Sequence, residues 1–308
     1  MGIVLQFVLL AAGFVLLIKG ADWFVEGASS IAAKFGIPQL VIGLTIVAMG
    51  TSAPEAAVSI SAALKGSADI TIGNIVGSNI MNVLVILGLA SVIVPIAVGK
   101  STIRYEMPFM IIISGLLLLL GLDGSINWID GLILTAAFLL YLGYLFLQAK
   151  KGREQEETQK EVVMWKAIIF LLLGLGMIVF GSDLTVDAAS KIAKEFGMSE
   201  RFIGLTIVAL GTSLPELCTS VMAARKGNAD IAIGNIVGSN VFNVLFVVGL
   251  SSLVTTVPFQ SKFIFDMLVA IAAAVLLLLC CILGKGKLKR WGGALLLISY
   301  AGYFAYII

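Results

Sequence analysis

One long stretch of this 308-residue sequence occurs twice, and this duplication limits the possible folds more than any other feature. Residues 41–84 and 202–245 align without gaps at an offset of 161 residues and are identical at 31 of 44 positions. A repeat of this kind predicts two structurally equivalent halves. We place the first half at 1–148 and the second at 164–308, with a short polar linker at 149–163 between them.

The composition predicts a protein of the lipid bilayer. Hydrophobic residues make up 60% of the chain and charged residues only 12%, which is too little charge for the surface of a soluble domain of this length. The net charge of +2 and the lack of a basic patch argue against a nucleic-acid partner. Neither a cofactor nor an obligatory protein partner is implied by any motif.

Apolar runs of about 20 residues, enough to cross a hydrocarbon core of about 30 Å, predict an all-α fold of ten transmembrane helices. The first five are expected at about 3–21, 39–64, 70–95, 104–121 and 127–148. The second five are expected at about 164–183, 201–225, 230–256, 263–283 and 290–307.

Five helices in each half is an odd number, so the second half should enter the membrane in the opposite direction from the first. Inverted repeats of this kind are typical of secondary transporters. Of the Lys and Arg residues at or beyond the ends of the predicted helices, fourteen fall on the side of the linker and five on the other. The positive-inside rule therefore predicts a multi-pass plasma-membrane protein with a cytoplasmic linker at 149–163 and both termini outside.

Each copy of the repeat carries one glutamate, Glu55 or Glu216, within an otherwise apolar segment. An ionisable residue at the centre of a bilayer costs roughly 2.5–3.5 kcal/mol on insertion scales, so its presence in both copies indicates a function. A glutamate that faces water at a helix end, or a protonated one that bonds a neighbouring helix, would be the structural alternative. Two such acids at the meeting plane of two halves predict a cation site.

The first motif, at 43–55 and 204–216, predicts a broken helix beside each glutamate. Pro54 cannot donate the backbone hydrogen bond that a helix requires there, and Gly50 adds local freedom. Free carbonyls would then lie beside Glu55 and the hydroxyls of Thr51 and Ser52. Such hard oxygen ligands suit Na⁺ and Ca²⁺. The second copy repeats the arrangement with Gly211, Thr212, Ser213, Pro215 and Glu216.

The second motif, at 68–84 and 229–245, predicts a polar stripe on one face of a helix. Its members recur at four-residue spacing as Asn74, Ser78 and Asn82, and again as Asn235, Ser239 and Asn243. Such a stripe can face an ion site, or it can simply hold neighbouring helices together.

Several other polar residues are weaker candidates. Asp22, Glu26, Asp183 and Asp187 follow the first predicted helix of each half, where a hydrated mouth or a helix cap would explain them. Asp69 and Asp230 directly precede predicted helices and are expected to be N-caps. The three cysteines Cys218, Cys280 and Cys281 are interpreted as small packing residues.

The motif pairs GTSAPE/GTSLPE and GNIVGSN/GNIVGSN closely resemble those of the calcium/cation antiporter superfamily. The resemblance is to its sodium/calcium exchanger branch in compact prokaryotic form, and it covers essentially the whole chain. It implies two inverted five-helix halves with four ion sites clustered at the midplane.

The resemblance also implies roles for individual residues. Glu55 and Glu216 would bind both calcium and sodium, and Thr51 and Thr212 would give backbone oxygens to calcium. Asn82 and Asn243 would border the centre. The remaining expected ligands form two sodium sites: Ser52, Ser78 and the Ala48 carbonyl in one, and Ser213, Ser239 and the Ala209 carbonyl in the other.

One position departs from part of the family, because some members carry aspartate where this chain has Asn243. Asparagine leaves two carboxylates in the cluster, which argues against potassium co-transport. The absence of histidine and the GTS-x-PE pattern disfavour proton coupling, although the glutamates themselves can titrate.

The expected function is therefore exchange of Na⁺ for Ca²⁺ across the membrane by alternating access, with both ions competing for the site at Glu55 and Glu216. A proton/calcium antiporter of the same superfamily is the nearest alternative. A calcium-selective channel would pass ions without a counter-ion. An intramembrane hydrolase would need an activating partner for its acids, and the sequence has no such set, so the protein is not expected to be an enzyme.

Overall fold

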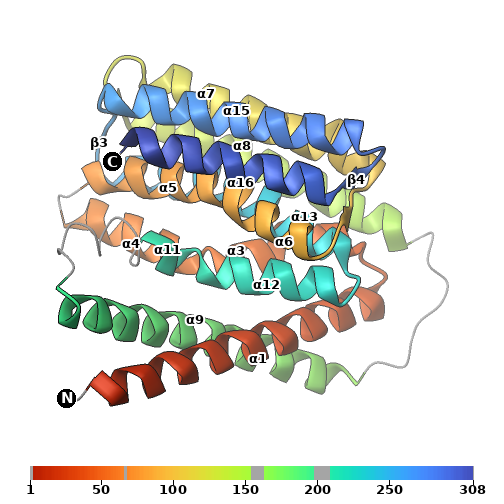
Figure 1. The fold of residues 1–308 in the computed structure, drawn as a ribbon. Coiled ribbons are helices and arrows are strands. Elements are labelled where there is room, and N and C mark those ends of the chain that lie inside the picture. The colour runs from red at the N-terminus through yellow and green to blue at the C-terminus, as the bar shows by residue number, and fades with distance from the viewer. Residues whose placement is uncertain (1–2, 66–67, 154–162, 198–208, 308) are drawn as a thin grey trace.

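The computed structural model describes residues 3–65, 68–153, 163–197 and 209–307, and nearly all of its regular structure is helical (Figure 1). Six helices run without interruption: α1 (Ile3–Phe35), α7 (Met107–Gly121), α8 (Trp128–Arg153), α9 (Met164–Glu195), α15 (Lys262–Leu283) and α16 (Arg290–Ile307). Helix α8 thus extends beyond residue 149, where the linker was expected to begin.

The helices that carry the repeated motifs are interrupted. In the first half they are α2 (Gln39–Ile42), η1 (Gly43–Val47), α3 (Ala48–Thr51), α4 (Ala53–Leu64), α5 (Asp69–Met81), η2 (Asn82–Leu87) and α6 (Gly88–Ile93). In the second half they are α11 (Ala209–Thr212), α12 (Leu214–Arg225), α13 (Ala229–Phe242), η5 (Asn243–Val248) and α14 (Gly249–Val254). The η segments, including η3 (Thr102–Glu106) before α7, are π-helical turns, which occur often at functional sites.

Four two-residue strands, which the sequence analysis did not anticipate, join the two halves. Strand β1 (Ile96–Ala97) pairs antiparallel with β4 (Lys287–Leu288), and β2 (Ser125–Ile126) pairs antiparallel with β3 (Val257–Pro258). Each pair contains one strand from each half. The halves are therefore linked by backbone hydrogen bonds as well as by helix packing.

Within the described residues, seven helices are long and apolar enough to cross a membrane, or eight if the bent pair Gln39–Thr51 and Ala53–Leu64 is one span. Burial separates these spans into two kinds. The motif spans Ile70–Ile93 and Ala229–Val254 are 83% and 94% buried, whereas the other five single spans are 22–39% buried. The repeated motifs therefore form the centre of the protein, and the other helices present apolar side chains to lipid.

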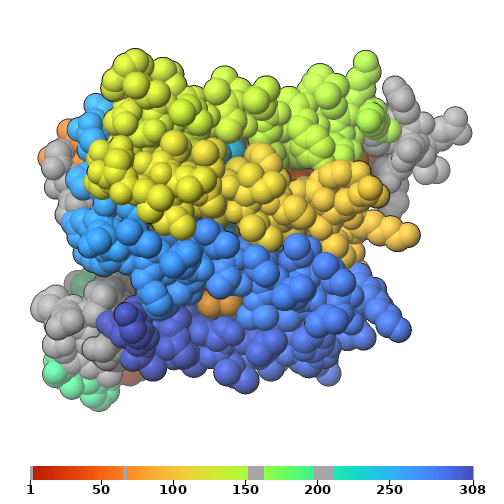
Figure 2. Space-filling model, turned by 90° about the horizontal axis from the view of Figure 1, so that it is seen from above, coloured from red at the N-terminus to blue at the C-terminus, as the bar shows by residue number. Residues whose placement is uncertain are grey.

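The helices lie in layers. Helices α1 and α9 cross each other at one side of the molecule, at the bottom of Figure 1, and the interrupted helices lie above them. The opposite face is covered by α7, α8, α15 and α16, which lie side by side when seen from above (Figure 2). The start of α1 and the end of α16 lie at the same end of the bundle (Figure 1).

Small residues allow α1 and α9 to pack closely. A Cβ added at Gly20 would lie 2.8 Å from the Gly174 carbonyl oxygen, and one added at Gly174 would lie 2.5 Å from the Phe24 backbone nitrogen. Two helical turns away from this contact, a Cβ at Gly13 would lie 3.0 Å from the Gly181 carbonyl oxygen. Glycines every seven residues thus bring the two backbones into direct contact, as in other membrane helix pairs.

Helices α1 and α9 are longer than the expected 3–21 and 164–183. The expected boundary lay at the first charged residues, but the buried face of α1 continues with Ala21, Phe24, Ala28 and Ala32. Its helix ends only at Gly36, whose φ of +62° favours glycine. At 33 residues the helix is about 50 Å long, more than a bilayer core of about 30 Å requires.

The N-cap prediction for the two aspartates is wrong. Helix α5 begins at Asp69 itself, with Ala68 in the N-cap position. Helix α13 begins at Ala229 after Asn228, so Asp230 lies within its first turn. A helix extended by one residue at its N-terminus is enough to remove an aspartate from the capping position.

We predict that Gly174→Ala lowers the unfolding temperature of the detergent-purified protein. The added methyl group would force apart the α1 and α9 backbones, and overpacking of this kind typically costs about 1–3 kcal/mol. Gly176→Ala is the matched control in the same helix, because a Cβ there meets nothing within 4 Å. Equal unfolding temperatures for the two variants would contradict the close packing.

Candidate cation site

Each glutamate lies directly after a break in its helix. Helix α3 ends at Thr51, α4 begins at Ala53, and the two segments meet at an angle of 51°. Ser52 between them has φ −84° and ψ 6°, away from regular helix, and Pro54 lies in the first turn of α4. The predicted break near Pro54 is therefore present in the structure. It places Glu55 in the first turn of a new helix, where free N–H groups favour negative charge.

The second half repeats this arrangement. Ser213, with φ −92° and ψ 0°, separates α11 from α12, and Glu216 lies in the first turn of α12. Ser52 and Ser213 thus occupy equivalent positions in the repeat, 161 residues apart. Sequence identity in the motif produces the same backbone geometry in both halves.

The two glutamates are buried and close to each other. Glu55 is 1% exposed, Glu216 is 0% exposed, and the two carboxyl groups interact electrostatically. The Ser52 hydroxyl donates a hydrogen bond of 2.9 Å across the halves to Oε1 of Glu216. The structure therefore brings together the two acids that the sequence singled out.

Several buried oxygens of the two repeated motifs, among them those of both acids, make no hydrogen bond. They are both carboxyl oxygens of Glu55, Oε2 of Glu216, Oγ of Ser213, and the amide oxygens of Asn82 and Asn243. Buried polar groups without partners are costly, and a buried charge is more so. Carboxylate and amide oxygens can only accept, so a cation would satisfy them together.

Neutral oxygens outnumber the acids in this cluster. Groups of three or more His, Cys, Asp or Glu side chains able to share a metal ion are absent from the described part of the chain. The two carboxylates provide at most two negative charges. The remaining donors are hydroxyl, amide and backbone oxygens, which suit Na⁺ or Ca²⁺ better than a soft metal.

Four asparagines lock the two halves together beside the site. Asn79 Nδ2 donates to the Asn240 carbonyl (3.4 Å), and Asn240 Nδ2 donates to the Asn79 carbonyl (3.2 Å). Asn82 Nδ2 donates to Asn240 Oδ1 (3.0 Å), and Asn243 Nδ2 donates to Asn79 Oδ1 (3.1 Å). Since each amide nitrogen is held in this way, the amide oxygens of Asn82 and Asn243 remain free.

Asn74 and Asn235 brace the broken helices through their amide nitrogens. Asn74 Nδ2 donates to the Glu55 carbonyl (3.3 Å) and to Ser59 Oγ (2.9 Å). Asn235 Nδ2 makes the equivalent bonds to the Glu216 carbonyl (3.4 Å) and to Ser220 Oγ (2.9 Å). The amide stripe therefore serves packing within each half at its outer position and contacts between the halves at its inner one.

The structure also places the remaining expected ligands. The Ser239 hydroxyl lies 3.4 Å from the Ala48 carbonyl, so Ser239 sits with Ala48 of the other half, whereas the resemblance had grouped it with Ala209. Thr51 Oγ1 donates to Asn235 Oδ1 (3.0 Å) and Ser78 is buried. Ala209 begins α11, but its side chain lies outside the described residues.

Thr212 faces a cavity of about 350 Å³ between α9 and the helix break. Asp183 and Asp187 line the same cavity, together with Pro54 at the edge of the site. Both aspartates are exposed and lie inside α9, not beyond its end. Their position agrees with the interpretation of these acids as part of a hydrated mouth.

Sequence reasoning did not single out Asn79, Asn240, Ser59 or Ser220. All four lie within the duplicated stretch and recur at the offset of 161 residues, so the duplication itself was the available signal. Their roles depend on contacts between helices, which the spacing along one helix does not reveal.

The fold and the site define a helical membrane protein whose two repeated halves enclose a pair of buried acids. A family model described as sodium/calcium exchanger protein matches residues 5–147 and again residues 166–308. The chain belongs to this sodium/calcium exchanger family, as the resemblance predicted. It is accordingly placed among transporters rather than enzymes.

Individual relatives extend over the whole chain. The protein CaxA of Alkalimonas amylolytica, a proposed antiporter, is 41% identical over 302 residues, with 94% of this chain and 95% of its own length covered. The sodium/calcium exchanger MaX1 of Methanosarcina acetivorans is 31% identical, with 98% of both chains covered. Among solved structures, the sodium–calcium exchanger NCX_Mj superposes with a TM-score of 0.87 at 32% identity over 100% of both chains.

We predict that Asn240→Ala destabilises the protein more than a buried substitution that affects one helix alone. The change leaves the Asn82 amide nitrogen without its partner and removes one of the bonds that the Asn79 carbonyl accepts, at about 1–3 kcal/mol for the unsatisfied group. Thermal unfolding in detergent measures the difference. Ser114→Ala is the control, because the Ser114 hydroxyl bonds only the Met110 carbonyl of its own helix. A similar loss in both variants would show that the asparagines do not hold the halves together.

Proposed function

We propose that the chain is a secondary active transporter that exchanges Na⁺ for Ca²⁺ by alternating access at the site between Glu55 and Glu216. The observation that carries this proposal is the set of buried oxygens without hydrogen bonds, which comes from both halves and contains both acids. Membership of the exchanger family supports the same two ions.

The charge of the site explains why exchange would be obligatory. Two carboxylates can neutralise one Ca²⁺ or two Na⁺, and further Na⁺ would rest on neutral oxygens. An empty site would leave both carboxylates uncompensated in a medium of low dielectric constant, which is unfavourable. With its site empty, the protein should resist the conformational change that moves the site's access from one side of the membrane to the other, until Na⁺ or Ca²⁺ is bound.

Individual ligands follow from the same proposal. Glu55 and Glu216 would bind both ions, with backbone oxygens of Thr51 and Thr212 contributing to calcium. Hydroxyl and backbone oxygens would complete the sodium sites, and Asn82 and Asn243 would border the centre. The hydroxyl and backbone donors are Ser52, Ser78, Ser213, Ser239, Ala48 and Ala209.

The proposed architecture is a ten-helix bundle of two inverted five-helix halves. Reciprocal hydrogen bonds between Asn79 and Asn240, and the location of the start of α1 and the end of α16 at one end of the bundle, support it. The excess of basic residues on the linker side supports a plasma-membrane orientation with the linker in the cytoplasm and both termini outside.

We predict that sodium-loaded proteoliposomes containing the protein take up ⁴⁵Ca²⁺ when the external solution lacks sodium. Glu55→Gln and Glu216→Gln should each reduce this uptake to background, because either change removes one of the two charges that hold the ion. Glu195→Gln is the matched control, since Glu195 is an exposed residue at the end of α9. Uptake that survives both site variants would contradict the proposal.

The driving ion is tested in the same vesicles. Uptake that a pH gradient drives as well as a sodium gradient does would move the protein to the proton-coupled branch. Calcium flux without any counter-ion would instead indicate a channel.

We further predict that Asn243→Asp changes the preference between ions. The substitution would add a third carboxylate beside the pair and should strengthen binding of cations relative to the present site. Competition of Na⁺ and K⁺ with ⁴⁵Ca²⁺ uptake measures the preference. Unchanged competition by both ions would show that position 243 does not border the transported ions.

A further inference from the structure

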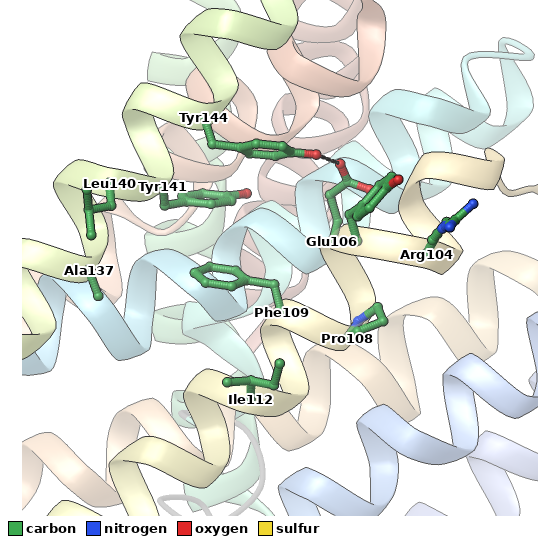
Figure 3. Close-up of a pocket in the computed structure, with 10 residues that line it drawn as sticks. Arg104, Glu106, Pro108, Phe109, Ile112, Ala137, Leu140, Tyr141 and Tyr144 are labelled. Atoms are coloured by element: carbon green, nitrogen blue, oxygen red, sulfur yellow. Dashed lines mark hydrogen bonds between the residues drawn. The ribbon is translucent and has the colours of Figure 1, made fainter.

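A third buried acid, Glu106, lies away from the central pair, at the end of η3. Its side chain is 3% exposed, and the Tyr144 hydroxyl donates a hydrogen bond of 2.7 Å to its Oε1 (Figure 3). Gln148 Nε2 in turn donates to the Tyr144 hydroxyl at 2.9 Å. The second carboxyl oxygen, Oε2, is buried without any hydrogen-bond partner.

On the membrane side, Glu106 borders an apolar cavity of about 460 Å³, shown in Figure 3. Its walls include Phe109 and two lipid-facing residues, Ile112 and Leu140, which are 66% and 76% exposed. Arg104 also lines this cavity, but it forms no ion pair with Glu106 within the described residues. The rest of the lining is mostly apolar, so this cavity gives the carboxyl group no ion pair.

On the inner side, Glu106 borders a smaller cavity of about 230 Å³ that contains a second acid, Asp230. The Asp230 carboxyl group forms neither a hydrogen bond nor an ion pair with any other described residue. The polar residues Ser101 and Gln148 line the same cavity, and no lysine or arginine does. Two acids, one buried (Glu106) and one exposed (Asp230), thus line the same small cavity without a lysine or arginine beside them.

We propose that this inner cavity is a second cation site, separate from the central pair, that takes Ca²⁺. The acids carry two negative charges, which one divalent cation neutralises. The side-chain oxygens of Glu106, Asp230, Ser101 and Gln148 are the hard donors that Ca²⁺ prefers, and water would complete its six to eight ligands. A volume of about 230 Å³ leaves room for those waters.

An ion at this site would connect η3, which carries Glu106, with α13, which carries Asp230. Asp230 lies in the first turn of α13, the helix that carries Asn235 and Ser239. Leu44 of η1, the segment directly before α3, lines the same cavity. Occupancy would therefore hold α13 and η3 together beside the motif helices, and the site would be structural or regulatory rather than part of the transport path.

The test measures Ca²⁺ binding where the central pair is disabled. In the purified Glu55→Gln/Glu216→Gln protein, equilibrium dialysis with ⁴⁵Ca²⁺ should show one ion bound per chain. Adding Glu106→Gln or Asp230→Asn should weaken that binding at least tenfold. Asp266→Asn is the matched control, because Asp266 accepts an equivalent bond from Tyr303 (2.9 Å) between α15 and α16 and should leave binding unchanged.

A second measurement reports the location of the ion. Tb³⁺ bound at Glu106 should luminesce on tyrosine excitation, because Tyr144 is in direct contact with that carboxyl group, and the added Tyr144→Phe change should reduce the signal. Thermal unfolding of each variant confirms that it is folded.

Two results would overturn the site: no Ca²⁺ bound to the double variant, or residual binding that neither Glu106→Gln nor Asp230→Asn weakens. Both measurements are independent of transport. A failure of ⁴⁵Ca²⁺ uptake by the wild-type protein would therefore contradict the exchange proposal without touching this one.

Discussion

The burial of two acids between apolar helices is the constraint on which the rest of this structure depends. Glu55 and Glu216 lie where water cannot reach them, and three of their four carboxyl oxygens have no hydrogen-bond partner. An arrangement of this kind is unfavourable unless a cation or a proton compensates it. The broken helices lie directly before these acids, and the free Ser213 hydroxyl and the oriented amides belong to the same repeated motifs.

Hydrogen bonds between the two halves hold that arrangement in place. Ser52 bonds the glutamate of the other half, and the asparagines at 79 and 240 bond each other's backbone. These bonds leave the oxygens of Asn82 and Asn243 free while fixing their direction. Each half thus supplies one acid and bonds the other half, so the arrangement of the two acids depends on both halves.

Much of the fold could be predicted because hydropathy and helix breakers are local properties. The apolar runs predicted most helices, and Pro54 predicted the break that places Glu55 at the start of α4. The lengths of α1 and α9 were underestimated because the charged residues after position 21 share their helix with a buried face that continues to Ala32. The π-helical turns that begin at Asn82 and Asn243 left no local signal, since the surrounding residues are ordinary helix formers.

The sequence by itself determined the class of the protein, its duplication and the identity of its two central acids, because composition and repetition are properties of the chain alone. Only the tertiary structure decided which oxygens remain free and which are used for packing. Asn74 and Asn82 occupy the same helical face, yet one braces Ser59 within its own half and the other meets Asn240 of the opposite half. That difference arises from a contact between residues 158 positions apart, and the spacing along one helix cannot encode it.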